Sequence, residues 1–97
     1  MTRWTFDDPH NLAVISNRKV IFGGEWIALV SHDDDDGGWQ FLSHEISPFR
    51  EGDAVIVSLQ KILQIDPSVA ELADLPLGWR ARRRSRDSPW HRSKATQ

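Results

Sequence analysis

Four consecutive aspartates, Asp33 to Asp36, followed by two glycines, are the densest group of reactive side chains in this 97-residue chain. Such a run could ligate calcium, attract a basic partner or keep a turn solvated. A calcium loop alternates its oxygen ligands and ends in glutamate at the twelfth position. Counting from Asp33 puts His44 at that position, and counting from His32 puts Ser43 there. Neither register fits, so we expect no calcium site.

The histidines raise a second metal hypothesis. His32 and His44 could approach each other across a hairpin, near the aspartates, but no HExxH or HxH spacing is present. The chain has no cysteine, which excludes disulfides, thiol catalysis and thiolate zinc sites. A site of two histidines and a carboxylate is an open alternative, whereas surface histidines without a ligand are the commoner case. We expect no metal ligands.

Catalytic motifs are also missing from the sequence. It contains no Gly-x-Ser-x-Gly elbow, no glycine loop that could cradle phosphates and no paired carboxylates in a recognisable context. We therefore predict that the protein is not an enzyme, has no catalytic residues and uses no cofactor.

A basic segment offers a nucleic-acid hypothesis. It contains five arginines in seven residues, namely Arg80, Arg82, Arg83, Arg84 and Arg86. These could neutralise phosphates while Trp79 and Trp90 stack on bases. However, residues 1–78 carry a net charge of −8 and residues 79–97 a net charge of +6. Because the acidic body would repel a polyanion, the arginines are better explained by solvation or by pairing with body carboxylates.

The tryptophans are candidates for core residues or for apolar anchors of a partner. Trp26, Trp39 and Trp79 lie in apolar segments and are expected in the core, while Trp90 is expected to dock the C-terminal part onto the domain. If Trp39 or Trp26 were exposed, either could anchor a protein partner.

Five segments have the apolar or alternating pattern of strands: residues 12–16, 25–31, 39–44, 54–57 and 79–82. Residues 2–6 could form a short edge strand, and residues 20–22 could extend the first strand or begin another. The loop 32–38 should close a hairpin, with Gly37 and Gly38 supplying positive φ. Residues 54–57 look like a buried strand.

Two helix starts follow the apolar run over residues 54–57. Ser58 is a plausible N-cap ahead of an apolar stripe, and Asp66 precedes a proline in the first helical turn. The order of elements predicts an α+β fold, a small antiparallel sheet of about four to five strands with one or two short helices on one face. We assign residues 1–90 to a single domain and 91–97 to a flexible tail. With no signal peptide or membrane span, we expect a cytoplasmic protein.

Seven segments stand in an order that resembles a family of short uncharacterised bacterial proteins. They are residues 13–16, 37–42, 53–55, 66–68, 72–76, 78–79 and 88–90, with the pattern GGWQFL, DPS, LADLP, GW and SPW. The turn followed by GW and an apolar strand is similar, more loosely, to a domain of unknown function grouped with immunity proteins of polymorphic toxin systems. That family pattern often has another tryptophan near Arg82. The resemblance supplies no catalytic residues.

These observations predict a small binding protein whose acidic surface meets a basic protein partner, and the resemblance implies a role of the immunity type. Its binding residues would be Asp33, Asp34, Asp35 and Asp36, with Trp39 or Trp26 as anchor. The alternative is nucleic-acid binding through the arginine-rich segment.

Overall fold

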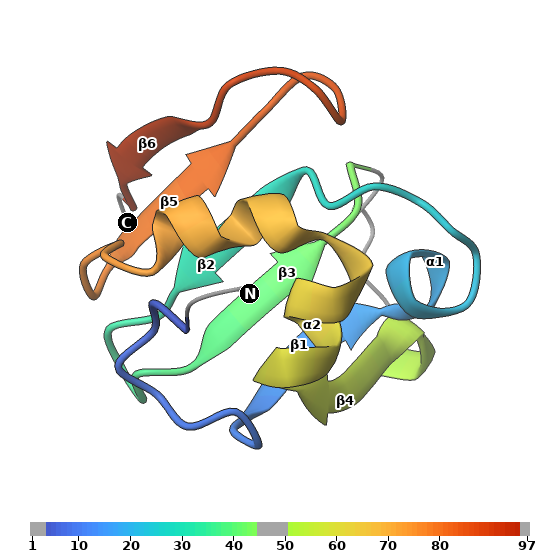
Figure 1. Cartoon of the computed structure of the whole chain (residues 1–97), viewed down its shortest axis with the longest axis horizontal. Coiled ribbons are helices and arrows are strands. Elements are labelled where there is room, and N and C mark those ends of the chain that lie inside the picture. The colour runs from blue at the N-terminus through green and yellow to red at the C-terminus, as the bar shows by residue number, and fades with distance from the viewer. Residues whose placement is uncertain (1–3, 45–50, 96–97) are drawn as a thin grey trace.

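The computed structural model describes residues 4–44 and 51–95 and has an α+β fold (Figure 1). Its six-stranded sheet has the order β4-β1-β3-β2-β5-β6. The strands are β1 (Ala13–Asn17), β2 (Leu29–His32), β3 (Trp39–Leu42), β4 (Ala54–Ser58), β5 (Trp79–Arg82) and β6 (His91–Lys94). The helical segments are α1 (Arg18–Ile21), η1 (Glu51–Asp53), α2 (Leu59–Ile65) and η2 (Pro67–Leu72).

The sheet is mixed, which corrects the prediction of an antiparallel sheet of four to five strands. β1 pairs with β3 in parallel, while the other neighbouring strands are antiparallel. In the parallel pair, the second strand of the β2–β3 hairpin is the one that lies beside β1, and β2 lies on its other side. This arrangement depends on contacts between distant segments rather than on local sequence.

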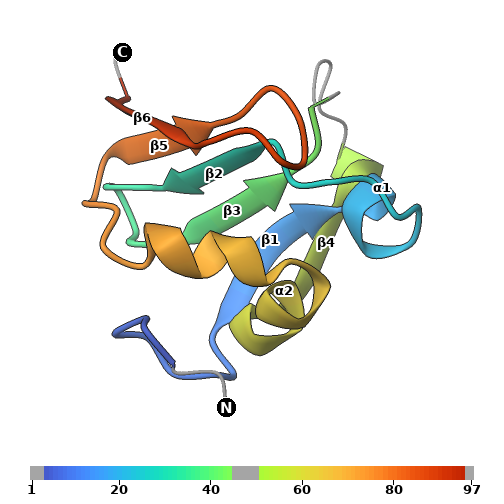
Figure 2. The same cartoon turned by 45° about the horizontal axis from the view of Figure 1, so that its top comes forward.

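Two short helical segments cover one face of the sheet (Figure 2). The Ser58 side chain accepts a hydrogen bond from the backbone N–H of Lys61 and caps α2, as predicted. Asp66 caps η2 by accepting from the N–H of Ser68, with Pro67 in the first turn. Both N-cap predictions are confirmed.

The core lies between this helical layer and the sheet. Strand residues alternate, so that one side chain in two faces the helices. The fully buried side chains from the sheet and from the helical layer include Val30, Phe41, Leu59, Ile62, Val69 and Leu72. Phe6, from the N-terminal segment, packs edge-on against Trp39 with ring centroids 5.2 Å apart.

Two predictions near the N-terminus are wrong. Residues 4–6 form no strand, and residues 1–3 lie outside the described residues. Residues 18–21 form α1 rather than a strand extension, because Asn17 accepts a hydrogen bond from the N–H of Val20 and starts a helical turn.

The structure also corrects two predictions about strand position. β4 was expected to be buried, but it lies at an edge of the sheet and Ile56 is 73% exposed. Residues 91–94 were assigned to a flexible tail, yet they form β6, whose register with β5 pairs Trp79 with Lys94 and Arg82 with His91. The sequence also predicts a connection over residues 46–52, of which residues 46–50 lie outside the described residues.

Candidate functional site

The face of the sheet opposite α2 and η2 carries polar side chains and is called here the open face. One row across it consists of cross-strand neighbours: Ile15 pairs with Gln40, Gln40 with Ser31, and Ser31 with Arg80. All four side chains retain some exposure. A polar row on one sheet face, with an apolar core on the other, makes this face a surface for contact with solvent or a partner.

The acidic loop, residues 33–38, connects β2 to β3 at one end of the open face. The N–H of Asp33 donates to the carbonyl of Gly38 over 2.8 Å, and the N–H of Gly37 donates to the carbonyl of Asp33 over 2.9 Å. Gly37 has φ 74°, which is the positive value expected for it. Gly38 does not have positive φ, so that half of the prediction is wrong.

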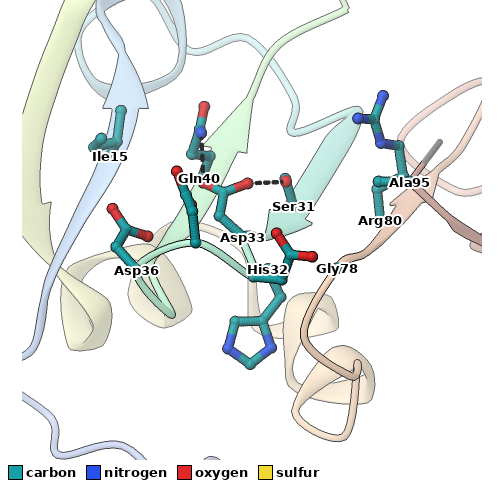
Figure 3. A pocket seen from close by; sticks show the side chains of 11 residues that line it. Ile15, Ser31, His32, Asp33, Asp36, Gln40, Gly78, Arg80 and Ala95 are labelled. Carbon is teal, nitrogen blue, oxygen red and sulfur yellow. Dashed lines mark hydrogen bonds between the residues drawn. The ribbon is translucent and has the colours of Figure 1, made fainter. Parts of the chain in front are cut away.

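Asp33 connects the acidic loop to the polar row. Its Oδ1 accepts a hydrogen bond of 2.7 Å from the hydroxyl of Ser31, and its Oδ2 accepts one of 2.7 Å from Nε2 of Gln40. Figure 3 shows these side chains meeting above β2 and β3. Because both carboxylate oxygens are engaged, Asp33 fixes the position of the loop as well as contributing charge.

A cavity of about 660 Å³ lies between the acidic loop and the open face (Figure 3). Its lining includes the four aspartates, the polar row and Gly78. Asp34, Asp35 and Asp36 are exposed, and Oδ1 of Asp36 accepts a hydrogen bond from the N–H of Gly38. One wall of the cavity therefore carries several exposed carboxylates. The volume of the cavity lies within the range of pockets that bind small molecules or single side chains.

Arg80 lines the same cavity from β5. In Figure 3 its guanidinium points away from the aspartates. Its Nε is buried without a hydrogen-bond partner, and within residues 4–44 and 51–95 no ion pair joins it to the acidic loop. The cavity thus keeps an acidic end and a basic end apart.

Neither tryptophan proposed as an anchor lies at this cavity. Trp39 is only 2% exposed and its indole N–H donates to Asp8, so Trp39 belongs to the core and does not meet the condition of exposure set for an anchor. Trp26 is half-buried and stacks on His44 with ring centroids 5.3 Å apart. Trp26 instead lines a separate cavity together with Asp66 and Arg86.

His32 and His44 do not come together. His32 stacks on Trp39 with ring centroids 3.9 Å apart, and its Nδ1 donates a hydrogen bond of 2.7 Å to the carbonyl of Leu75. Because a carbonyl only accepts, Nδ1 carries the proton. His32 therefore fastens the end of β2 to the segment after η2. Within the described residues, no group of three or more metal-ligating side chains could hold a metal ion.

The arginine-rich segment is divided between several environments. Arg83 is 6% exposed and forms an ion pair with Asp66, while its guanidinium lies 4.2 Å from the ring of Trp90. Burial raises the pKa of the Asp66 carboxyl, but hydrogen bonds from Ser68 and Arg83 and the charge of Arg83 outweigh burial and lower this pKa below its ordinary value. Arg83 is thus a structural residue.

The other arginines of this segment belong to β5 and to the loop after it. Arg80 and Arg82 stand on either side of the buried Ala81 and share one face of β5, while Arg84 and Arg86 follow in the loop. Arg86 donates to the carbonyl of Gly24 over 3.4 Å. The structure does not bring all five predicted arginines together on one face.

Sequence reasoning missed Ser31, Gln40 and Ile15 as part of the site. Alternation along each strand could have placed them on one face, but only the observed strand order makes them neighbours.

Comparisons with protein-family models, with curated proteins and with solved structures found no match. In the part of the chain that the structure describes, no helix is long and apolar enough to cross a membrane.

Proposed function

We propose that this protein is a binding protein whose acidic loop and open face receive a basic segment of another protein. The observation that carries this proposal is the exposed position of Asp34, Asp35 and Asp36 along one wall of a cavity. A lysine or arginine side chain entering the cavity could form charge-assisted hydrogen bonds with these carboxylates. Asp33, held by Ser31 and Gln40, keeps the loop in place for such contacts.

The protein's own basic residues support this reading because several of them are engaged elsewhere. Arg83 pairs with Asp66, and Arg92 pairs with Asp74 over 2.8 Å. Among the described residues, no arginine or lysine forms an ion pair with the acidic loop. The loop therefore retains its charge for an external cation.

The charge of the body would act at longer range. Residues 1–78 carry a net charge of −8, and a field of this sign accelerates encounter with a basic partner more than it strengthens the final complex. The rate of association should therefore fall as salt is added.

An immunity-type role belongs to the same proposal. Its support is the sequence pattern described above, together with an acidic surface suited to occluding a basic enzyme or toxin. The partner would be met in the cytoplasm. Nucleic-acid binding is the alternative, but it is weakened by the burial of Arg83 in an ion pair and by the net charge of −8 over residues 1–78.

The test uses an unstructured lysine- and arginine-rich peptide as the probe and follows backbone amide resonances by NMR. We expect the largest shifts at the acidic loop, Ser31 and Gln40. The double variant Asp34→Lys/Asp36→Lys should lose this response. The matched control Glu71→Lys/Asp87→Lys makes the same change in net charge at exposed positions outside the cavity lining and should retain it.

The wild type, the loop variant and the control variant, used as baits in native lysate, extend the test to natural partners. A captured protein that is lost with the loop variant and kept with the control supports the proposal. Equal peptide binding by both variants, or shifts centred elsewhere, would contradict it. Binding of duplex or single-stranded DNA that disappears in Arg82→Ala/Arg84→Ala would favour the alternative.

A further inference from the structure

The two edges of the sheet differ in how they are protected from pairing with another strand. β6, at one edge, carries His91, Arg92 and Lys94, and charged side chains discourage edge-to-edge association. β4, at the other edge, has the sequence Ala-Val-Ile-Val-Ser and carries neither a charge nor a proline. Within the described residues, β1 is the only strand that pairs with β4.

The centre of β4 is also the most exposed apolar part of the sheet. Ile56 is 73% exposed, and its cross-strand neighbour Ile15 is 38% exposed. Together they form an apolar strip on the open face that reaches the free edge. Short strands rich in β-branched residues are strong pairing segments when an edge is left free.

We propose that β4 pairs with β4 of a second copy of this chain, antiparallel and centred on Ile56. In that register Ile56 faces Ile56 of the second copy, Val55 faces Val57, and Ala54 faces Ser58. Every cross-strand pair is uncharged, and the apolar strip of one copy continues into that of the other.

Charge does not oppose a second copy at this edge. Residues 1–78 carry a net charge of −8 and residues 79–97 carry +6, so the acidic parts of two copies repel each other wherever they face one another. The uncharged β4 edge is a place where they can approach without that cost. One residue beyond the strand, Asp53 would face Leu59 of the second copy, so the register brings no two carboxylates opposite each other.

The proposed pairing also fixes how the two copies are oriented. The two β4 strands are related by a two-fold axis that passes between the two Ile56 residues, perpendicular to the sheet, so both open faces lie on the same side of the dimer. The contact itself involves only two five-residue strands. Interfaces this small are at the weak end of protein association, so we expect a concentration-dependent dimer.

The first test is sedimentation equilibrium of the full chain over about a hundredfold range of concentration. The mean mass should rise from that of the 11.1 kDa monomer towards twice this value. Ile56→Lys should weaken association about tenfold or more, because it places a charge on the edge. Leu77→Lys is the matched control, since Leu77 is 55% exposed in the turn before β5, and it should leave association unchanged. Circular dichroism verifies that both variants fold.

The second test uses the absence of native cysteine. Under mild oxidation, Ile56→Cys should form a covalent dimer rapidly, because central cross-strand Cβ atoms lie about 5 Å apart. Leu77→Cys should cross-link much more slowly. A monomer at every concentration, unchanged association of Ile56→Lys, or equal cross-linking of the two cysteine variants would each overturn the proposal.

Discussion

Gln40 on β3 donates a hydrogen bond of 2.7 Å from its Nε2 to Oδ2 of Asp33 in the acidic loop. This bond joins the loop to a strand flanked by β1 and β2. The other oxygen of the same carboxylate accepts from Ser31 on β2. The first carboxylate of an acidic run is thereby fixed by two neighbouring strands, while the next three remain exposed.

Replacing Gln40 with leucine should destabilise the fold. The variant removes a donor to a half-buried carboxylate, and hydrogen bonds to charged groups contribute about 1.5–3 kcal/mol. Because the site is partly solvated, we expect a loss near or below the lower limit of this range, about 1–2 kcal/mol, measured by urea unfolding. Gln64→Leu on the exposed side of α2 is the control and should change stability little. Equal stability of the two variants would show that the Asp33 contact is unimportant.

Gly78→Ala should be destabilising for a backbone reason. Gly78 has φ 82°, and a Cβ there would lie 3.3 Å from Oδ2 of Asp34. A non-glycine residue in this conformation costs about 1–2 kcal/mol, and that amount is the expected loss in thermal or urea unfolding. Gly52→Ala is the control, because open space surrounds a Cβ at Gly52 and its φ is not positive. If both variants were equally stable, the strain at Gly78 would be negligible.

Local signals predicted much of the fold. The caps at Ser58 and Asp66 and the hairpin around Gly37 depend on residues close in sequence, and they appear where expected. β6 could not be predicted in this way, because its four residues are exposed and show no apolar alternation. β6 is held in place by its hydrogen-bonded ladder with β5, by the ion pair of Arg92 with Asp74 and by the hydrogen bond from Arg92 to the carbonyl of Glu71.

The candidate site was predicted only in part. The aspartate run is visible in the sequence, but its relation to Gln40 and Ser31 depends on which strands become neighbours. The predicted burial of β4 was wrong for a related reason. A continuous run of β-branched residues is typical of a buried strand, and only the strand order reveals that this one lies at an edge.

Asp66→Asn should lower stability in a pH-dependent way. The folded pKa of Asp66 is depressed, so its ionised form stabilises the fold above the unfolded pKa of about 3.9. This contribution is lost as the pH falls through the folded pKa. Near neutral pH the variant leaves the buried charge of Arg83 without its carboxylate, at a cost of about 3 kcal/mol.

Urea unfolding of the wild type and of this variant at a series of pH values tests the prediction. The stability difference should be full near neutral pH and should shrink as the pH is lowered below about 4. Asp74→Asn is the control, because the Asp74 carboxylate is 79% exposed and its pair with Arg92 is solvated. A difference between wild type and Asp66→Asn that stayed constant at acid pH would contradict the assignment.

Trp90→Ala should loosen β6 as well as destabilise the protein. Trp90 immediately precedes β6 in the sequence, and its ring lies 4.2 Å from the guanidinium of Arg83. The packing of this ring therefore holds the start of β6 against the core. Loss of this packing and of the cation–π contact should cost about 2 kcal/mol. Hydrogen exchange of the β6 amides should accelerate more than that of the β1 amides. His91→Ala, at an exposed position in the same strand, should preserve the protection of β6. If β6 exchanged at the same rate in both variants, its order would depend on the β5 ladder alone.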